Sequence, residues 1–307
     1  MGGEILDRPL RSLSRAEVVA LLDASLEVEL RELGRAGGAA FRDLPDVSWA
    51  VNAMPGASVY ATRLTATDAP GRIAELTAAL ELFGPVTWWA GPTATPGNLS
   101  DLLLAAGYIL EDDEAGMAAD LDDVVTDLSR PDNLTIEEIG GAEDGHGRLE
   151  EGALDAWLDV NRRAQGWSEG KVARRRALYR EDDRRPRPWR HYLGRLGGES
   201  VSASRLLVSH GAAMIHGVAT VPEARRQGIG SALTLAALRG GRALGCRIGV
   251  LQASSIGQGP YRRLGFRMVA PYLRFVREPA VPEPASSEPD LAAAERDGSA
   301  ADDEWAA

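Results

Sequence analysis

The sequence contains one cysteine, Cys246, among its 307 residues. A single thiol excludes a disulfide within the chain and argues against a metal site built from cysteine ligands. We therefore expect no metal cofactor. Cys246 lies where a helical pattern gives way to a strand pattern, so a small buried side chain is the better interpretation there than a nucleophile.

Long apolar runs are also missing. No segment approaches the roughly 20 consecutive apolar residues that a membrane-spanning helix needs. Glu4, Asp7 and Arg8 follow Met1 closely, and this charge differs from the apolar centre of a secretory signal peptide. The sequence thus predicts a cytoplasmic protein without a membrane partner.

An excess of positive charge is absent as well, because the formal net charge is −11 at pH 7. Nucleic-acid binding needs a basic face, so we expect no nucleic-acid partner. From Glu278 onward nine acidic residues face one arginine, which places −8 of the total in that stretch and leaves the folded part near neutral. Since large apolar residues are almost missing there, residues 279–307 are predicted to be a disordered acidic tail.

Helix and strand patterns alternate over a length that suits two domains of about 150 residues. Ser14 and Glu17 form a capping box before a long amphipathic helix that ends at Gly34. The pattern predicts an α/β (α+β) protein with a mixed sheet. Further helices are expected over 69–83, 99–106, 150–165, 168–179 and 232–244, and strands over 48–51, 58–64, 86–91, 116–121, 134–139, 189–196, 200–209, 212–221 and 247–254.

The segment from Gly217 to Ser231 carries the clearest chemical signal. A β-branched run ends at Pro222, and a loop with Gly228 and Gly230 then leads into a helical pattern. Glycines at a helix N-terminus allow several backbone N–H groups to converge on an anion such as a pyrophosphate. We call this loop the phosphate cradle. Its spacing differs from the P-loop and from the dinucleotide-binding fingerprint.

The spacing Arg-x-x-Gly-x-Gly after a strand resembles the acyl-CoA-binding motif of the GNAT superfamily of N-acyltransferases. Downstream, the stretch from Tyr261 to Phe266 matches the Tyr-x-x-x-Gly-Phe signature of the same family. The resemblance implies a GNAT fold and acetyl-CoA as the cosubstrate. It assigns donor contacts to Ala219, Thr220, Val221, Arg225, Arg226, Gln227, Gly228, Ile229, Gly230, Ser231 and Ser254, the last at a position where many members carry asparagine.

Residues 86–121 resemble the end of a second GNAT domain, with a strand, a proline turn, a short helix and Gly107-Tyr108. No Arg-x-x-Gly-x-Gly follows a strand before Gly91. We therefore interpret residues 1–125 as a degenerate GNAT-like domain without a cradle. Residues 126–278 are predicted to be the catalytic GNAT domain, as in tandem GNAT proteins.

The resemblance also suggests catalytic residues. Tyr261 occupies the position of the general acid, since a phenol stays protonated at neutral pH. The glutamate that many members use as a general base has no counterpart, because its slots hold Met214 and Gly249. His216, whose imidazole titrates in the useful range, is the predicted base, and Glu199 with a chain of water molecules is the alternative.

The acceptor is expected to be a small primary amine. In GNAT folds the first two helices of the domain border the acceptor pocket, and here Trp167 and Tyr272 are candidate aromatic walls. The basic helix predicted over 168–179 would tolerate a ligand that also carries a carboxylate or phosphate. The predicted activity is N-acetyl transfer from acetyl-CoA by direct attack in a ternary complex, in a monomer or homodimer. Two alternatives stay open: an acyl-CoA-binding sensor or scaffold without turnover, and a transferase of a longer acyl group.

Overall fold

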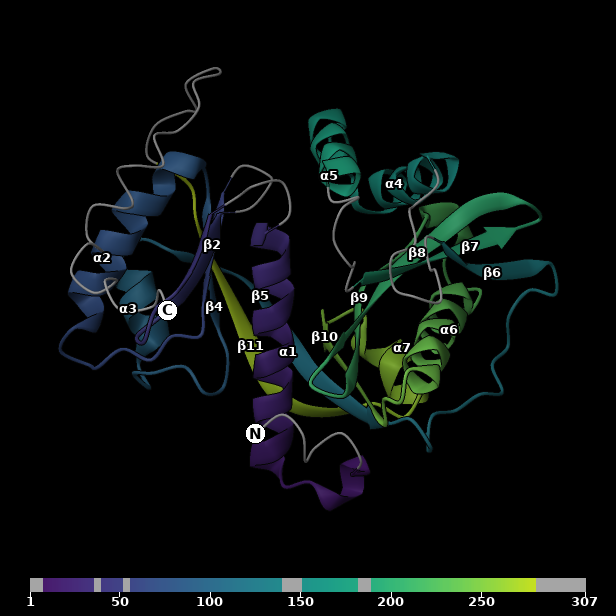
Figure 1. The fold of residues 1–307 in the computed structure, drawn as a ribbon, viewed down its shortest axis with the longest axis horizontal. Coiled ribbons are helices and arrows are strands. Elements are labelled where there is room, and N and C mark those ends of the chain that lie inside the picture. Colours follow the sequence, from purple (N-terminus) through teal and green to yellow (C-terminus); the bar gives the residue numbers. More distant parts are fainter. Residues whose placement is uncertain (1–7, 36–39, 52–55, 140–150, 182–188, 280–307) are drawn as a thin grey trace, which may run out of the picture.

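The computed structural model of the protein describes residues 8–35, 40–51, 56–139, 151–181 and 189–279. Within these residues eleven strands form one mixed sheet in the order β1-β2-β3-β4-β11-β5-β10-β9-β8-β7-β6 (Figure 1). The α/β class and the mixed sheet expected from the sequence are confirmed. Apart from Pro279, the predicted acidic tail lies outside the described residues.

The strands are β1 (Phe41–Asp43), β2 (Ser48–Val51), β3 (Ala57–Tyr60), β4 (Val86–Ala90), β5 (Ile109–Asp120), β6 (Leu134–Ile139), β7 (Trp189–Leu196), β8 (Glu199–Ser209), β9 (Ala212–Thr220), β10 (Ile248–Ala253) and β11 (Arg267–Arg277). The helices are α1 (Arg15–Arg35), α2 (Ala69–Leu80), α3 (Leu99–Ala105), α4 (Glu151–Gln165), α5 (Glu169–Glu181), α6 (Ile229–Ala243) and α7 (Gln258–Arg263). In the described part of the chain, no helix has the length and apolar character needed to cross a bilayer.

The two halves of the chain repeat one arrangement. In each, two parallel strands are joined by a helix: β3–α2–β4 in the N-terminal half and β9–α6–β10 in the C-terminal half. Each unit is followed by a short helix, α3 or α7, and by a long strand, β5 or β11. This repetition is the structural form of the tandem relationship that the sequence suggested.

Helix α1 lies between the two halves (Figure 1). It begins with the predicted capping box, in which the Glu17 carboxylate accepts the Ser14 N–H at 2.7 Å and Ser14 Oγ accepts the Glu17 N–H at 3.3 Å. Its apolar side packs against residues from both halves, including Tyr60 and Met214. One helix therefore belongs to the core of both repeats.

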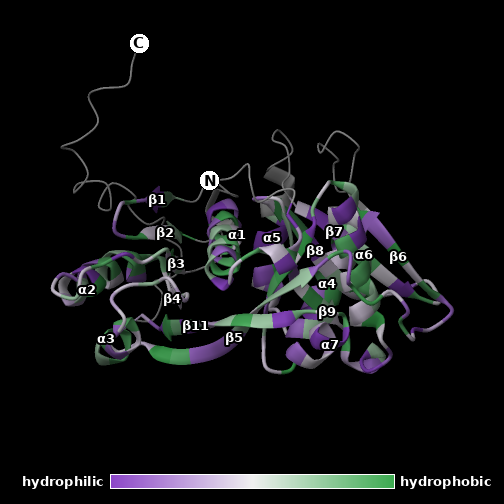
Figure 2. Ribbon diagram, turned by 90° about the horizontal axis from the view of Figure 1, so that it is seen from below, coloured by the Kyte–Doolittle hydropathy of each residue, from purple (hydrophilic) through white to green (hydrophobic). Residues whose placement is uncertain are grey.

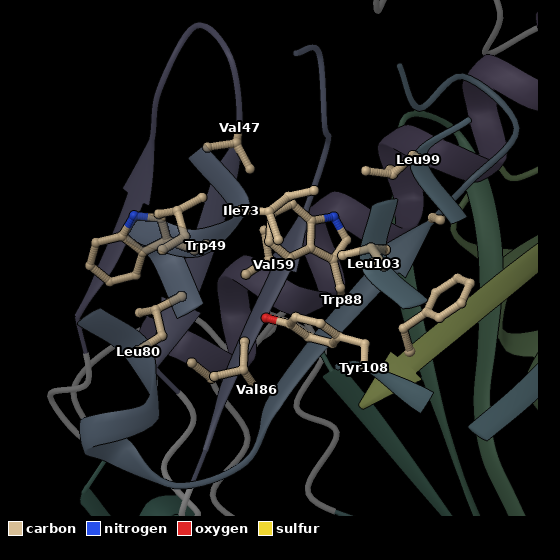
Figure 3. Packing of buried hydrophobic residues seen from close by; sticks show 14 of the residues in the cluster. Val47, Trp49, Val59, Ile73, Leu80, Val86, Trp88, Leu99, Leu103 and Tyr108 are labelled. Carbon is tan, nitrogen blue, oxygen red and sulfur yellow. The ribbon is translucent and has the colours of Figure 1, made fainter. Parts of the chain in front are cut away.

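The N-terminal half has its own apolar core (Figure 3). Trp88 is fully buried, packs edge-on against Tyr108 with 6.0 Å between ring centroids, and donates its indole N–H to Thr62 at 2.9 Å. The Tyr108 hydroxyl is 2.8 Å from the hydroxyl of Thr77. Both aromatic residues therefore bury large rings while their polar atoms keep hydrogen-bond partners.

Strand β5 connects the two halves through the sheet. It lies between β10 and β11, and β11 in turn pairs with β4 of the N-terminal half (Figure 1). Figure 2 shows β5 and β11 side by side where they connect the two halves. The sequence pattern predicted this strand only from Gly116, whereas it begins at Ile109. The polar run Glu111 to Glu114 hid the first half of the strand. The predicted domain boundary at residue 126 thus leaves β5 in the N-terminal domain, although β5 lies between β10 and β11 of the C-terminal half.

We expect residues 126–279, produced alone, to lack the cooperative thermal unfolding of the full chain. Without β5 the fragment would leave the backbone edges of β10 and β11 unpaired, and it would also expose the surfaces that α1 covers. Co-production with residues 1–125 should restore one cooperative transition, followed by circular dichroism. A fragment that unfolds cooperatively at the temperature of the full chain would contradict this dependence.

Candidate active site

Strands β9 and β10 separate partway along their length. They pair in parallel at Ala212–Ile248, Ala213–Gly249 and Met214–Val250, and no pair follows. Beyond this point β9 pairs with β8 alone, up to Thr220, and β10 pairs with β5 alone, up to Ala253. The backbone edges that face each other across the gap are therefore free of ladder bonds. The unpaired edge of β9 thus begins after Met214, before the donor contacts predicted at residues 219–221.

A β-bulge at Gly217 sets the direction of the side chains along β9. The register with β8 shifts between the pairs Ala203–Ala219 and Arg205–His216, and Gly217 has a φ of 63°. Before the bulge His216 shares a face with Arg205. After it, Val218 and Thr220 lie toward α6, because a Cβ at Gly230 would be 3.7 and 3.5 Å from their side chains.

The cradle follows the end of β9 directly. Arg226 and Gly228 have left-handed backbone angles, with φ of 63° and 77°, and α6 begins at the next residue, Ile229. The first N–H groups of an α-helix have no partner within the helix, so they point out of its N-terminus. Arg225 fixes the loop by donating from Nε to the carbonyl of Thr220 and from Nη2 to the carbonyl of Ala164, both at 2.9 Å.

Gly228 and Gly230 have different structural reasons to be glycine. A Cβ at Gly228 would lie 2.1 Å from the carbonyl oxygen of Ser129, in the segment that joins the halves. Close approach of this backbone and the positive φ therefore require glycine there, whatever binds to the loop. A Cβ at Gly230 meets its nearest neighbour at 3.5 Å, which is ordinary contact. Gly230 is therefore the cleaner position for testing the cradle.

The gap between β9 and β10 leads into a cavity of about 530 Å³. The cavity lies between the two halves and is lined by α1, α4, α5, the ends of β9 and β10, and the start of α7. Among its lining residues are four that the sequence singled out: Trp167, His216, Ser254 and Tyr261. The cradle residues 225–231 lie outside it, at the far end of the free edge of β9.

Tyr261 lies in α7, which follows β10, and lines the cavity. Burial raises the pKa of its phenol to about 12, and a hydrogen bond with Thr234 opposes this rise. Its ring packs edge-on against Phe266 at 5.9 Å. Ser254 begins the adjoining turn, and its carbonyl accepts the Gly257 N–H at 2.9 Å. The phenol is thus protonated at any pH at which the protein would work.

His216 points toward α1. Its Nδ1 is 2.7 Å from Oε1 of Glu29, a carboxylate that is only 2% exposed, and its ring packs edge-on against Trp189. The bulge at Gly217 places the His216 side chain on this face of β9. Glu29 was not expected at the site, because it lies in the N-terminal half, on a helix predicted from its apolar residues.

Glu114 is a second carboxylate that sequence reasoning missed. It lies on β5 one residue before the Ala115–Ala253 pair, which places it beside Ser254 at the end of β10, and it lines the cavity. Burial raises its pKa to about 7; Arg274 opposes the rise, and Asp112 and Glu29 add to it. The available signal was an acidic run that immediately precedes a fully buried strand segment. Glu199, the alternative base, lies instead at the β7–β8 turn and pairs with Arg163 at 3.0 Å.

Trp167 forms part of the opposite wall with cationic neighbours. Lys171 Nζ is 4.8 Å from its ring centroid and the Arg175 guanidinium carbon is 5.7 Å away. Burial lowers the pKa of Lys171, and the nearby Arg175 and Arg274 lower it further. The predicted basic helix therefore turns two of its cations, Lys171 and Arg175, toward the cavity.

Tyr272 does not line this cavity, so its expected role as an acceptor wall is corrected. It is fully buried beside a separate cavity of about 30 Å³, and its hydroxyl donates to Asp23 Oδ1 at 2.5 Å. Thr93 donates to the other oxygen of the same carboxylate at 2.5 Å. The ring reaches this place because Gly116, its neighbour on β5, has no side chain.

Comparisons with known proteins agree with this geometry. Residues 188–268 match the family model described as an acetyltransferase (GNAT) domain. A comparison with curated protein sequences gave no significant match. A GCN5-related N-acetyltransferase from Kribbella flavida is similar in structure, with a TM-score of 0.61 and 18% identity over 86% of this chain and 96% of that one.

Two further solved structures have the same architecture. A GCN5-related N-acetyltransferase from Sphaerobacter thermophilus has a TM-score of 0.57 and 16% identity, and the match covers 90% of this chain and 97% of that one. A tandem GNAT protein from the clavulanic acid biosynthesis pathway has a TM-score of 0.53 and 14% identity, covering 88% and 96%. Residues 188–268 therefore match a GNAT acetyltransferase domain, and the fold of the chain is similar to that of solved GNAT proteins, one of them a tandem GNAT protein.

Proposed function

We propose that the protein transfers an acetyl group from acetyl-CoA to a small amine, by direct attack of the amine on the thioester. One observation carries this proposal: the unpaired edge of β9 runs from the N-terminus of α6 to a cavity lined by the half-buried side chains of Tyr261 and Glu114 and by the buried carboxylate of Glu29. GNAT proteins are acyltransferases in general, and the finer assignment depends on how these residues fit the donor and acceptor.

The donor site fits an extended acyl-CoA. The free N–H and C=O groups between His216 and Thr220 can pair with the amide groups of a pantetheine arm, as a strand edge pairs with an added strand. The first amides of α6 and the cationic side chain of Arg226 suit its pyrophosphate. The donor contacts assigned to residues 219–221, 225–231 and Ser254 remain part of the proposal in this sense.

The amine must lose a proton as its nitrogen bonds to the thioester carbon. We assign this proton to Glu114, because a carboxylate with a pKa of about 7 is half ionised near neutral pH. His216, which contacts Glu29, is the base predicted from the sequence and is the second candidate here, and the two are separable by substitution. The C–S bond then breaks, and the sulfur leaves with the bonding electrons as a thiolate.

Tyr261 stabilises that thiolate. An alkyl thiol has a pKa of about 8.5, well below the value of about 12 that burial gives this phenol. Full proton transfer from the phenol to the sulfur is therefore uphill, and a hydrogen bond donated to the developing charge is the favoured role. This refines the general-acid assignment that the family signature suggested.

The two alternatives, a sensor or scaffold and a transferase of a longer acyl group, each make a different demand on the site. A sensor or scaffold would bind acetyl-CoA without needing an ionisable group at the acceptor side, and the carboxylates Glu29 and Glu114 favour turnover over that interpretation. A longer acyl group would have to occupy the cavity of about 530 Å³ in place of part of the acceptor. Nothing in the lining residues selects acetyl by size, so donor length is measured in the same assay.

The direct test is release of free thiol from acetyl-CoA with a panel of small amines, amino acids, aminoglycosides and peptides. We expect turnover with small amines. Tyr261→Phe should lower kcat, because it removes a hydrogen bond made in the transition state, and it should leave donor affinity nearly unchanged. Turnover of peptides alone would overturn the choice of acceptor. Binding of acetyl-CoA with no turnover of any acceptor would favour the sensor.

Gly230→Val should weaken acetyl-CoA binding by at least about tenfold and leave the fold intact. Its side chain would extend toward Val218 and Thr220, into the space beside the free edge of β9 where the donor is proposed to lie. Calorimetric titration measures the affinity, and thermal unfolding checks the fold. Gly71→Val, in α2 with no atom within 4 Å of its Cβ position, is the control for valine in a helix. Normal donor affinity in the Gly230 variant would place the phosphate site elsewhere.

The rate should rise with pH and reach half its maximum near pH 7, because Glu114 accepts a proton only when it is ionised. Glu114→Gln should remove this inflection and lower kcat by about 10² to 10⁴-fold, with unchanged donor affinity. Asp113→Asn, an exposed neighbour on the same strand, should behave like the native protein. If His216→Asn removes the inflection and Glu114→Gln retains it, His216 is the base.

A further inference from the structure

Arg205 on β8 is a buried cation with an incomplete environment. The residue is only 5% exposed, it lines the cavity, and its Nε has no hydrogen-bond partner. Its guanidinium carbon lies 4.5 Å from the ring centroid of Trp189. Among the described residues no carboxylate forms an ion pair with it. An arginine stays charged at any working pH, and a buried charge without a counter-ion is unfavourable.

Arg205 and the residues near it suit a small zwitterion, with Arg205 for the anionic group and Glu29 for the cationic group. Arg205 is directly opposite His216 in the β8–β9 register, so the two side chains share the face that turns to the cavity. Across from them Glu29 contacts His216 through Oε1, and its Oε2 is buried without a partner. A hydrogen-bond donor and an acceptor, both without partners, thus flank one histidine on the wall of one cavity.

We propose that the acceptor is an amine that also carries a carboxylate, as an amino acid does. The carboxylate pairs with Arg205, and the amine lies at the Glu29–His216 pair on the side of Glu114. This inference rests on the proposed transferase function and names the acceptor class for its acceptor cavity.

The charges around the cavity favour one negative charge on the acceptor. Lys171, Arg175 and Arg274 from other walls add positive potential, and Arg274 is already shared with Glu111 and Asp112 at 3.3 and 3.5 Å. Glu29 and Glu114 line the same space and would oppose the second charge of a phosphate. A carboxylate is therefore a better match than a phosphate dianion, while a strongly cationic acceptor would meet three basic walls.

The test compares matched acceptors that differ only in the acid group: an α-amino acid, its carboxamide, the corresponding simple amine, and an aminoalkyl phosphate. We expect the native protein to prefer the amino acid in kcat/KM. Arg205→Met keeps an apolar chain over Trp189 and removes the charge. It should raise KM for the amino acid by about 10 to 100-fold and leave KM for the carboxamide within about twofold, as expected for loss of a charge-assisted hydrogen bond. Arg195→Met, on β7 and paired with Glu137 away from the cavity, is the control.

Calorimetric binding of the same acceptors, in the presence of CoA, separates this inference from the transferase proposal. If the amino acid binds and Arg205→Met weakens this binding, but no acceptor is turned over, the carboxylate site is supported and the transferase is rejected. Turnover of neutral amines in preference to amino acids would reject the site and keep the transferase. An equal effect of Arg205→Met on the amino acid and its carboxamide, or preference for the phosphate, would overturn the assignment, as would absence of any binding.

Discussion

The pairing of β5 on both of its edges is the constraint on which this structure depends. The strand is 12 residues long, and Ala115 to Ala118 pair with β10 on one side and β11 on the other. Since β5 comes from the first half of the chain and its neighbours from the second, the halves share one sheet. The cavity forms where this shared strand reaches the end of β10, which explains why residues from both halves line it.

A second constraint acts on β9. A strand that alternates regularly would place His216 and Val218 on the same face. The extra residue at Gly217 breaks that alternation, so His216 turns to α1 while Val218 and Thr220 turn to α6. One side of the strand can then meet the acceptor and the other the donor. The loss of pairing between β9 and β10 after Met214 supplies the opening between them. The bulge and the loss of pairing are both features of the backbone, and the small residues Gly217 and Ala219 permit them.

The sequence predicted the local elements better than the site. Helices and strands with a clear period, the capping box at Ser14 and the strand–loop–helix at the cradle follow from short-range patterns and appear as expected. Glu29 and Glu114 could not be found in this way, because each is brought to the cavity by contacts between the halves. Tyr272 was misplaced for the same reason: its neighbour Asp23 lies far away in the sequence. Gly228 was predicted as a donor contact, and the structure adds a separate reason for glycine there, the close backbone of Ser129.

The charges of the cavity are divided between the halves. Both carboxylates, Glu29 and Glu114, come from the N-terminal half, whereas Lys171, Arg175, Arg205 and Arg274 come from the C-terminal half. The loop between β3 and α2, which corresponds to the cradle, contains no glycine, in keeping with the prediction that this half has no donor site of its own. That half nevertheless gives the cavity its negative groups. The C-terminal half alone would present a cavity lined by cations, which would hold the acid group of an acceptor but offer its amine no carboxylate. The N-terminal half is in this sense part of the proposed acceptor site.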